Sequence, residues 1–440
     1  LLHLLRPTRS VFPFLRYWGK YTDGSDVTVT QAKALGFYPY NYGHVWEVKV
    51  NSDGTYQAMK HLSMGRQAME VAKVMPDRKT AYITDDGTNV IFTKYIADRA
   101  GDLTDGELFC AKFTQTSAKP SAAEAFTSTI KWISMGSSKQ ADLKKVVETT
   151  KFQDLFEAIA PVNKTCATGY TGVNAGGLGH ECLKLKEGMA LLASRFETRR
   201  YAGYVGCTSE FRKWEGITYD PVNMKLYTAI SEVSSGMESN MKKGAATSSY
   251  DAGTNNDIQI TYNTCGCVMQ LDLDAAYDAT TMSTMVCGKM MPKDAEGNTC
   301  ELNMIASPDN VAMIPEFNQL IIGEDTSAHQ NDVMWIYDIA TKALTRIFST
   351  PYGSETTSPY WFPNVGGKFS YITAVVQHPY GESDTDKVTE AKATGLAGYV
   401  GYLGPFKTVV EMPGNGAAGT TASIVLSLVV SCLAAVFVSF

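Results

Sequence analysis

The chain has 440 residues, of which 44% are hydrophobic and 19% are charged, a balance typical of a globular protein rather than a disordered one. This length allows up to three ordinary domains or one large β-domain, with enough apolar surface for a sizeable core. The formal net charge of −6 argues against a nucleic-acid-binding protein, which needs a basic face, but it leaves open a phosphate-binding enzyme that uses metal ions.

The first part of the chain, residues 1–40, carries no clear element. It opens on Leu1, and its short apolar start is interrupted by Arg6, Pro7 and Arg9, so it is not a full signal peptide. We therefore interpret residues 1–40 as an incomplete N-terminal segment and expect one large domain over residues 41–410.

Most of that domain consists of short apolar segments between turn residues, a pattern that predicts strands. Several segments share one order: an apolar strand, a turn such as Asp-Pro-Val-Asn at 220–223 or Pro-Glu-Phe-Asn at 315–318, and a second apolar strand that ends in acidic or polar residues. Repeated antiparallel units of this kind favour a β-propeller, in which strand ends converge on a central channel. A β-sandwich with helical decorations is the alternative.

Helical spacing is confined to two stretches, residues 138–162 and 179–204. They predict a helical insertion over about 138–204, between two strand-rich parts of the chain.

The end of the chain is an uncharged apolar run of 17 residues, 424–440. It is at the short limit for crossing a bilayer, and no basic residue follows it. Small residues beside Asn415 and a short spacer precede the run, which is the pattern of a GPI-attachment signal with Asn415 as attachment site. Residues 411–440 are thus expected to be a spacer and hydrophobic anchor signal; a plain C-terminal membrane helix or another form of burial are the alternatives.

Cysteine usage agrees with a compartment outside the cytoplasm. Of nine cysteines, Cys432 lies in the tail, and the even number that remains favours disulfides. Cys265 and Cys267 are too close for easy mutual pairing. Asn163 begins an Asn-Lys-Thr glycosylation sequon. We therefore expect a secreted or cell-surface glycoprotein that is attached to a membrane through its C-terminus.

Acidic residues recur where the predicted strands end, and in a propeller they would meet at one rim. Each one taken singly is best explained as a solvated turn residue or a local cap. For the whole set a cation is the better explanation, since Ca²⁺ takes several oxygen ligands and iron accepts carboxylates. The candidate metal ligands are Glu70, Asp85, Asp86, Glu215, Asp309, Glu324, Asp325 and Glu355.

The chain lacks the common nucleotide-binding and hydrolase motifs: GxSxG, a P-loop, HExxH, or a GxGxxG after a strand. The glycine-rich "GGLGHE" at 176–181 is expected to be a loop that leads into the second helix. The oxygen-rich "DAGTNND" at 251–257 lacks the glycine and glutamate positions of an EF-hand and is expected to be a surface loop.

Several segments, taken together and in order, resemble the PhoX-type alkaline phosphatases from about Tyr42 to about Gly381. They are "YGHVWEV" (42–48), "MGRQAMEVA" (64–72), "AYITDDG" (81–87), "GDLTDGELFCAKF" (101–113), "FETRRYAGYVGCTSEFRKWEG" (196–216), "SPDNV" (307–311), "GEDTSAHQNDVMW" (323–335), "GSETTSPYW" (353–361) and "VQHPYGES" (376–383).

The resemblance implies a mainly β fold, a six-bladed β-propeller with helical insertions, whose channel holds iron and calcium and which hydrolyses phosphate monoesters. It places Glu215 and Glu355 at the family's metal-binding glutamates, and we expect these two to be catalytic. It places Asp309, Asp325 and Glu70 in segments that line the same site, with Asp85 and Asp86 nearby. The partners so implied are a small phosphate ester and a membrane, with no nucleic acid, for a monomeric chain.

Two departures from the family's pattern bear on activity. The family carries a Cys-Glu motif ahead of the segment that matches "YGHVWEV", whereas the first cysteine here is Cys110, and Met69 stands where the family often has histidine. The leading hypothesis is an extracellular metal-dependent phosphomonoesterase. The alternatives are a catalytically weak propeller used for surface binding or structure, and another calcium-dependent propeller hydrolase such as a lactonase or phytase.

Overall fold

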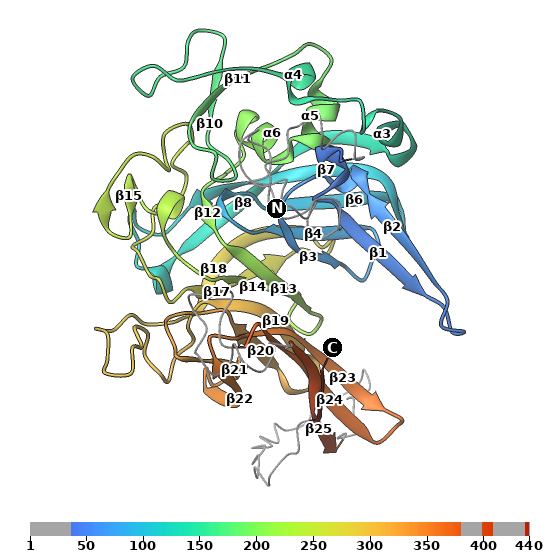
Figure 1. Cartoon of the computed structure of the whole chain (residues 1–440), viewed down its shortest axis with the longest axis vertical. Helices are drawn as coiled ribbons and strands as arrows, with labels where there is room; N and C mark the ends of the chain where they lie inside the picture. The colour runs from blue at the N-terminus through green and yellow to red at the C-terminus, as the bar shows by residue number, and fades with distance from the viewer. Residues whose placement is uncertain (1–36, 380–397, 408–435, 440) are drawn as a thin grey trace, which may run out of the picture. The chain divides into compact units, whose positions relative to one another are not determined.

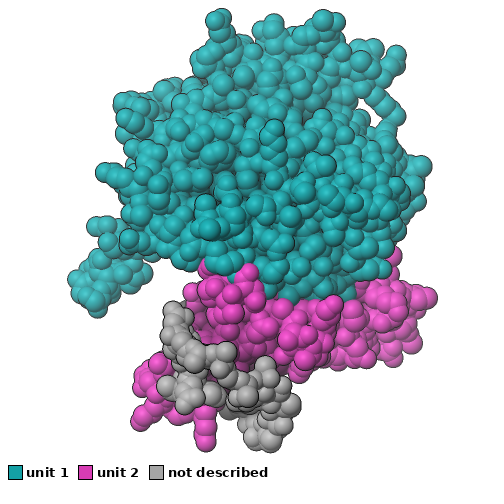
Figure 2. Space-filling model, turned by 180° about the vertical axis from the view of Figure 1, so that it is seen from behind, with its two compact units in different colours: residues 1–217, 224–287 teal, residues 218–223, 288–440 magenta. Residues whose placement is uncertain are grey.

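The computed structural model describes residues 37–379, 398–407 and 436–439. The chain divides into two compact units (Figure 2), and each is described by itself. Unit 1 takes in residues 1–217 and 224–287, and unit 2 takes in residues 218–223 and 288–440. Strands dominate both units and the helices are few and short (Figure 1), which confirms the mainly β fold class.

The largest sheet has nine strands. In sheet order they are β13 (Trp214–Asp220), β14 (Lys225–Ile230), β17 (Cys267–Leu273), β18 (Ala279–Cys287), β8 (Thr127–Lys139), β7 (Asp102–Gln115), β6 (Thr93–Arg99), β4 (Thr80–Asp85) and β3 (Met69–Val74). Two runs within it, β3-β4-β6-β7 and β13-β14-β17-β18, follow chain order. Each run is an antiparallel meander of the kind that the strand and turn pattern predicts.

Aspartates close the turns between successive strands. Oδ1 of Asp77, after β3, accepts the backbone N–H groups of Lys79 and Thr80, both at 2.9 Å. Asp220 does the same for Val222 at 2.8 Å and Asn223 at 3.2 Å. Such side-chain bonds replace the ladder bonds that the backbone loses at a turn, and they explain why the predicted turn at 220–223 forms.

The aromatic core beneath this sheet is centred on Trp214, which is fully buried. Its ring centroid lies 4.4 Å from that of Phe92 and 4.3 Å from that of Phe211. Its indole Nε1–H donates to Oγ1 of Thr228 at 2.7 Å, so the one polar group of the ring is satisfied. This packing fixes the start of β13, where Glu215 follows directly.

Shorter elements complete unit 1. The small strands are β1 (Val45–Val50), β2 (Tyr56–His61), β5 (Thr88–Val90), β9 (Phe156–Ile159), β10 (Thr171–Val173), β11 (Glu181–Leu185), β12 (Phe211–Arg212), β15 (Met241–Lys242) and β16 (Ala245–Ala246). The 3-10 turns are η2 (Pro39–Asn41), η3 (Leu62–Met64), η4 (Ala123–Ala125) and η5 (Ser235–Met237).

The helical insertion contains less helix than its spacing predicts. The helices are α3 (Gln140–Val146), α4 (Phe152–Leu155), α5 (Ala190–Phe196) and α6 (Thr198–Tyr204). Residues 181–185, expected to be helical, form β11 instead, because Cys182 and Leu183 are buried in a sheet with β9 and β10 and Cys182 is bonded to Cys166. The helix prediction was therefore wrong for this part of the second stretch.

Unit 2 contains two four-stranded antiparallel sheets, and the strands of each follow chain order. The first has β19 (Pro308–Ile314), β20 (Gln319–Glu324), β21 (Asn331–Asp338) and β22 (Leu344–Tyr352), with the 3-10 turn η6 (Pro315–Phe317). The second has β23 (Glu355–Val365), β24 (Phe369–Gln377), β25 (Tyr399–Lys407) and β26 (Val436–Ser439). Buried side chains of both sheets form one core, including Ile321 and Met334 from the first and Ile372 and Ala374 from the second.

Four four-stranded meanders therefore occur within the described residues, two in each unit. They are the repeats expected of propeller blades, but the number of blades and the boundaries 1–40, 41–410 and 411–440 stay predictions. Asn415 and the part of the terminal apolar run before residue 436 lie outside the described residues. Within the described ranges, no helix is long and apolar enough to cross a membrane.

Disulfides fix several of these elements. Cys110 on β7 is bonded to Cys207, Cys166 to Cys182 on β11, and Cys267 on β17 to Cys287 on β18. Cys265 and Cys300 are disulfide-bonded as well, so every cysteine of the described ranges is oxidised. As the sequence predicts, Cys265 and Cys267 are not bonded to each other.

Candidate metal centre

Three of the predicted ligands meet in unit 2. Single carboxylate oxygens of Asp309, Asp325 and Glu355 all lie within 4.8 Å of one another. Asp309 is the second residue of β19 and Asp325 follows the last residue of β20. Since β19 and β20 are antiparallel, with Pro308 opposite Glu324, the beginning of one and the end of the other share a sheet edge.

Glu355 reaches the same place because the two sheets of unit 2 approach closely here. Gly323 on β20 lies against Thr356 on β23, and a Cβ atom added at Gly323 would come within 2.2 Å of the Thr356 carbonyl oxygen. Thr356 Oγ1 also accepts the backbone N–H of Glu324 at 2.7 Å. A glycine at this position is thus needed for the strand ends, and with them Asp325 and Glu355, to come together.

Neighbouring side chains orient two of the three carboxylates, those of Asp309 and Glu355. Asn310 donates to Asp309 Oδ1 at 2.8 Å. Gln377 donates to Oε2 of Glu355 at 2.8 Å, and Nε2 of His378 lies 2.6 Å from its Oε1. His378 has a φ of +27°, a value that non-glycine residues seldom adopt. Such strain is retained where the surrounding contacts hold it and is concentrated at functional sites.

Asp332, the second residue of β21, adds a fourth acid whose charge is not compensated. Its side chain is 1% exposed; Oδ2 accepts the Thr326 N–H at 3.0 Å, and Oδ1 is buried without a hydrogen-bond partner. Burial, with the negative charges of Glu324, Asp325 and Glu355, raises the pKa of Asp332 to about 10.

A set of oxygen ligands with one buried carboxylate oxygen left over fits a hard cation. The cation would bring the positive charge that this group lacks, and it would return the pKa of Asp332 toward its ordinary range. The residues present therefore fit the metal dependence expected from the sequence.

Glu324 is adjacent to this group in the sequence, but both of its carboxylate oxygens accept hydrogen bonds from other residues. Its Oε1 accepts the N–H of Ala306 at 2.8 Å and Nε1–H of Trp335 at 2.7 Å. Its Oε2 accepts the N–H of Val333 at 2.9 Å and lies 3.1 Å from Nδ1 of His329. Four partners satisfy a carboxylate, so the contacts favour a structural role for Glu324 rather than metal ligation.

The other predicted ligands belong to unit 1. Glu215 on β13 is 5% exposed and accepts a hydrogen bond from Ser231 at 3.1 Å, with Lys213 Nζ 3.7 Å from its Oε1. Glu70 on β3 is exposed. Asp85, the last residue of β4, is completely buried, and Asp86 is half-buried.

Asp85 is neutralised by Arg199 of α6. Nε of Arg199 donates to both carboxylate oxygens, at 3.0 Å and 2.8 Å, and Nη2 bonds both Oδ1 of Asp85 and the carbonyl of Asp86. Gly176 allows this approach, because a Cβ there would come within 2.9 Å of the Arg199 side chain. The predicted loop at 176–181 thus packs against the arginine that binds Asp85.

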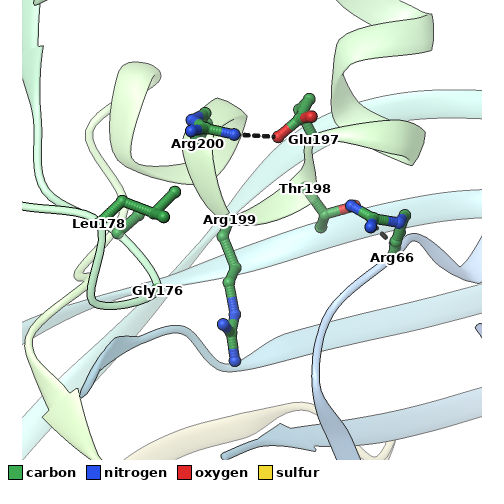
Figure 3. Close-up of a pocket in the computed structure, with 8 residues that line it drawn as sticks. Arg66, Gly176, Leu178, Glu197, Thr198, Arg199 and Arg200 are labelled. Atoms are coloured by element: carbon green, nitrogen blue, oxygen red, sulfur yellow. Dashed lines mark hydrogen bonds and ion pairs between the residues drawn. The ribbon is translucent and has the colours of Figure 1, made fainter. Parts of the chain in front are cut away.

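A small cavity of about 20 Å³, with room for about one water molecule, lies beside Arg199. Figure 3 shows the residues that line it. Two further arginines line it, Arg200, which is paired with acids, and Arg66, which is bonded to backbone carbonyls. Arg200 bonds Glu197 at 2.7 Å and Glu181 at 2.8 Å, while Arg66 donates to the carbonyls of Tyr42 and Phe196. The cavity is therefore a balanced charge network rather than an open anion site.

The structure brings together Asp309, Asp325 and Glu355, three of the predicted ligands. The candidate ligands predicted from the sequence do not include Asp332, His378 or Arg199. Asp332 carried the same signal as the others, an acid at the boundary of an apolar strand. The partnership of Arg199 with Asp85 spans 114 residues of sequence and left no local signal.

Comparisons with known proteins place the chain in a family. The model of the family described as alkaline phosphatase PhoX matches residues 16–379, and the chain belongs to this family of metal-dependent phosphomonoesterases. No curated protein matches the sequence.

A solved structure of the same family is similar in fold. Pseudomonas fluorescens PhoX in complex with vanadate, a transition state analogue, is 18% identical, with a TM-score of 0.52 over 82% of this chain and 55% of that one. The chain thus spans little more than half the length of this relative. A luciferin-regenerating enzyme (11% identity, TM-score 0.27, 82% and 94% covered) and the Dos1 propeller (8%, 0.23, 81% and 67%) also match.

Proposed function

We propose that this chain hydrolyses phosphate monoesters at a metal centre that includes Asp309, Asp325 and Glu355. The observation that carries the proposal is the meeting of these three carboxylates within 4.8 Å, in a chain of the alkaline phosphatase PhoX family. The vanadate complex of the Pseudomonas relative supports a phosphate ester as the substrate class.

In this proposal, residues of the chain bind the metal and keep its ligands in the right orientation. Asp309, Asp325 and Glu355 would hold the metal, and Asp332 would either join them or balance its charge. Gln377 and His378 keep the carboxylate of Glu355 in one orientation. A metal bound there would supply Lewis acidity toward a phosphoryl group whose oxygens carry negative charge. Following the sequence resemblance, we propose calcium and iron as the metals.

Glu215 is a further proposed catalytic residue, on the basis of the sequence resemblance. It is buried, accepts a hydrogen bond from Ser231 and lies near Lys213. Glu70 and Asp86 remain candidate ligands by the sequence resemblance alone. The hydrogen bonds of Asp85 and Glu324 favour structural roles for those two.

The location and form of the protein belong to the same proposal. We propose an extracellular or cell-surface monomer with a six-bladed propeller fold and a C-terminal anchor attached at Asn415. Complete oxidation of the described cysteines supports an oxidising compartment. Asn163 is exposed in a turn, with a φ of +48°, which supports its use as a glycosylation site.

The test is hydrolysis of a generic phosphate monoester by the full chain, before and after chelation. Elemental analysis of the same sample identifies the metals. Activity that is lost on chelation and restored by calcium with iron supports the proposal. A folded protein without metal and without turnover contradicts it and favours a propeller used for surface binding or structure. Parallel assays on lactones and phytate separate the other hydrolase classes.

A further inference from the structure

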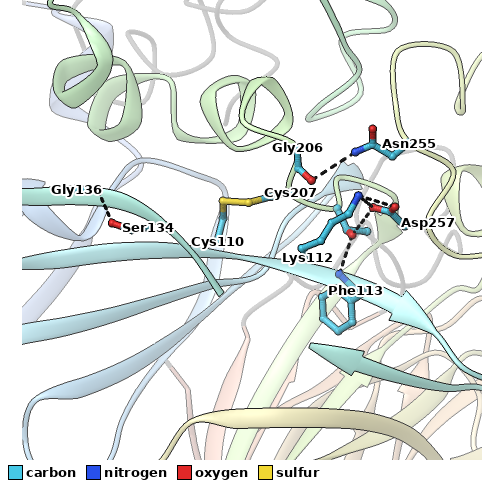
Figure 4. Close-up of a disulfide and its surroundings, with 10 residues drawn as sticks. Cys110, Lys112, Phe113, Ser134, Gly136, Gly206, Cys207, Asn255 and Asp257 are labelled. Atoms are coloured by element: carbon cyan, nitrogen blue, oxygen red, sulfur yellow. Dashed lines mark hydrogen bonds and ion pairs between the residues drawn. A yellow bond between two sulfur atoms is a disulfide. The ribbon is translucent and has the colours of Figure 1, made fainter. Parts of the chain in front are cut away.

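A second group of buried acids lies in unit 1, around the oxygen-rich segment 251–257. Four carboxylates act on one another here, and two of them are compensated. Asp257 is bound by Lys112 at 2.6 Å and by the Thr208 hydroxyl at 2.6 Å (Figure 4). Glu238 accepts the backbone N–H groups of Ser235, Lys243 and Gly244.

The other two acids, Glu210 and Asp251, are not compensated. Glu210 is 0% exposed and Asp251 is 7% exposed. One oxygen of each accepts a backbone N–H, that of Ile258 for Glu210 and that of Asn240 for Asp251. The other oxygens, Oε1 of Glu210 and Oδ1 of Asp251, are buried and have no hydrogen-bond partner. Two unsatisfied buried carboxylate oxygens are costly unless something binds them.

Asn89 connects the two segments and adds a third such oxygen. Its Nδ2 donates to the carbonyl of Ser209 at 3.0 Å and to that of Tyr250 at 2.8 Å, the residues directly before Glu210 and Asp251. Its side chain is 1% exposed, and Oδ1 is also buried without a partner. The two donor bonds fix the amide orientation, because a flipped amide would put oxygen against two carbonyls.

We propose that Asn89, Glu210 and Asp251 bind a divalent cation of the calcium class, in addition to any metal at the carboxylates of unit 2. The three unpartnered oxygens are hard ligands, two of them carry negative charge when ionised, and no sulfur or imidazole takes part, which is the donor set that Ca²⁺ prefers. Backbone carbonyls and water would complete the coordination.

The electrostatics of the group agree with this site. Burial, with the charges of Asp257 and Asp251, raises the pKa of Glu210 to about 8, and burial with the charge of Glu238 raises the pKa of Asp251 to about 6. Bound calcium would stabilise both carboxylates in their ionised form. The competing explanation is a Glu210 that stays protonated beside buried water, and it makes different predictions.

The test counts calcium. The full chain is stripped with a chelator, dialysed against calcium alone, and analysed for calcium per monomer, with its melting temperature recorded before and after calcium is added. We expect Glu210→Gln and Asp251→Asn each to lose one calcium per monomer and part of the calcium-induced rise in melting temperature. Asp257→Asn, in the same segment but bound by Lys112, is the matched control and should keep the wild-type count.

Calcium binding at Glu210 and Asp251 can be tested separately from the proposed phosphatase activity. In an Asp325→Asn/Glu355→Gln background, designed to remove metal from unit 2, one calcium should persist and should disappear when Glu210→Gln is added. A wild-type calcium count in both Glu210→Gln and Asp251→Asn overturns the proposal. Should both variants fail to fold, absence of calcium from the Asp325→Asn/Glu355→Gln protein overturns it as well.

Discussion

Two buried aspartates at strand ends, one in each unit, show opposite solutions to the same electrostatic problem. Asp85 closes β4 in unit 1 and is held by three bonds from the Arg199 guanidinium. Asp332 opens β21 in unit 2 with one backbone donor and one unpartnered oxygen, among other acids. Where the chain supplies its own cation the acid is held in an internal ion pair, and where it does not the acid favours an external cation.

The carboxylates of unit 2 test this comparison with the largest expected effect. We expect Asp325→Asn or Glu355→Gln to lower kcat/KM for a phosphate monoester by roughly a thousandfold or more, equivalent to about 4 kcal/mol of transition-state stabilisation. Each variant should also bind less metal, which elemental analysis measures.

Asp294→Asn is the matched control for these variants, because Asp294 is a half-buried acid of unit 2 whose side chain caps its own turn. It should keep wild-type activity and metal content. Full activity in Asp325→Asn and Glu355→Gln would place the chemistry elsewhere in the molecule.

Removing Arg199 tests the other side of the comparison. Arg199→Met leaves the Asp85 carboxylate buried and without its guanidinium, and we expect it to lower the free energy of unfolding by about 3–5 kcal/mol. Urea unfolding of the chelated protein measures the loss.

The double variant Arg199→Met/Asp85→Asn should recover part of this loss, because the asparagine amide is neutral and leaves no unpaired charge in the core. If Asp85 is instead a metal ligand, Arg199→Met would leave the fold stable, and Asp85→Asn alone would remove metal and activity.

The difference between the two aspartates also marks what sequence could predict. The position of an acid at the end of an apolar strand is local information, and it put Asp309, Asp325 and Glu355 among the candidates, beside acids such as Asp85 that have other partners. The partner of each acid is not local. Arg199 comes from a helix far along the chain, and Glu324 is satisfied by Trp335 and backbone groups that only the folded sheet assembles.

The same limit applies to the fold. Alternating strands and aspartate turns predicted the antiparallel meanders, because both are set by neighbouring residues. Residues 181–185 were misassigned as helix because their apolar spacing fits either structure. Tertiary packing against β9 and β10, with the bond from Cys182 to Cys166, decides the strand.

The smallest expected effect concerns Asp332 itself, and it depends on pH. The raised pKa of about 10, against an ordinary value of 3.8, means that the folded protein without metal keeps a proton that the unfolded chain releases. The free energy of unfolding of the chelated protein should therefore fall as pH rises between those two values.

Asp332→Asn removes this titration, so its stability without metal should depend less on pH. At pH 8 it should exceed that of the wild type, because the wild-type chain must take up a proton at Asp332 when it folds and the amide need not. Urea midpoints at pH 5, 7 and 9 measure how the free energy of unfolding changes with pH.

Asp338→Asn, at the opposite end of β21, is the control. Hydrogen bonds from Thr341 lower the pKa of Asp338, so this substitution should change the pH dependence of stability in the opposite direction. An unchanged slope in Asp332→Asn would assign the titration to another acid, and Asp332 would then be ionised in the folded protein even without metal.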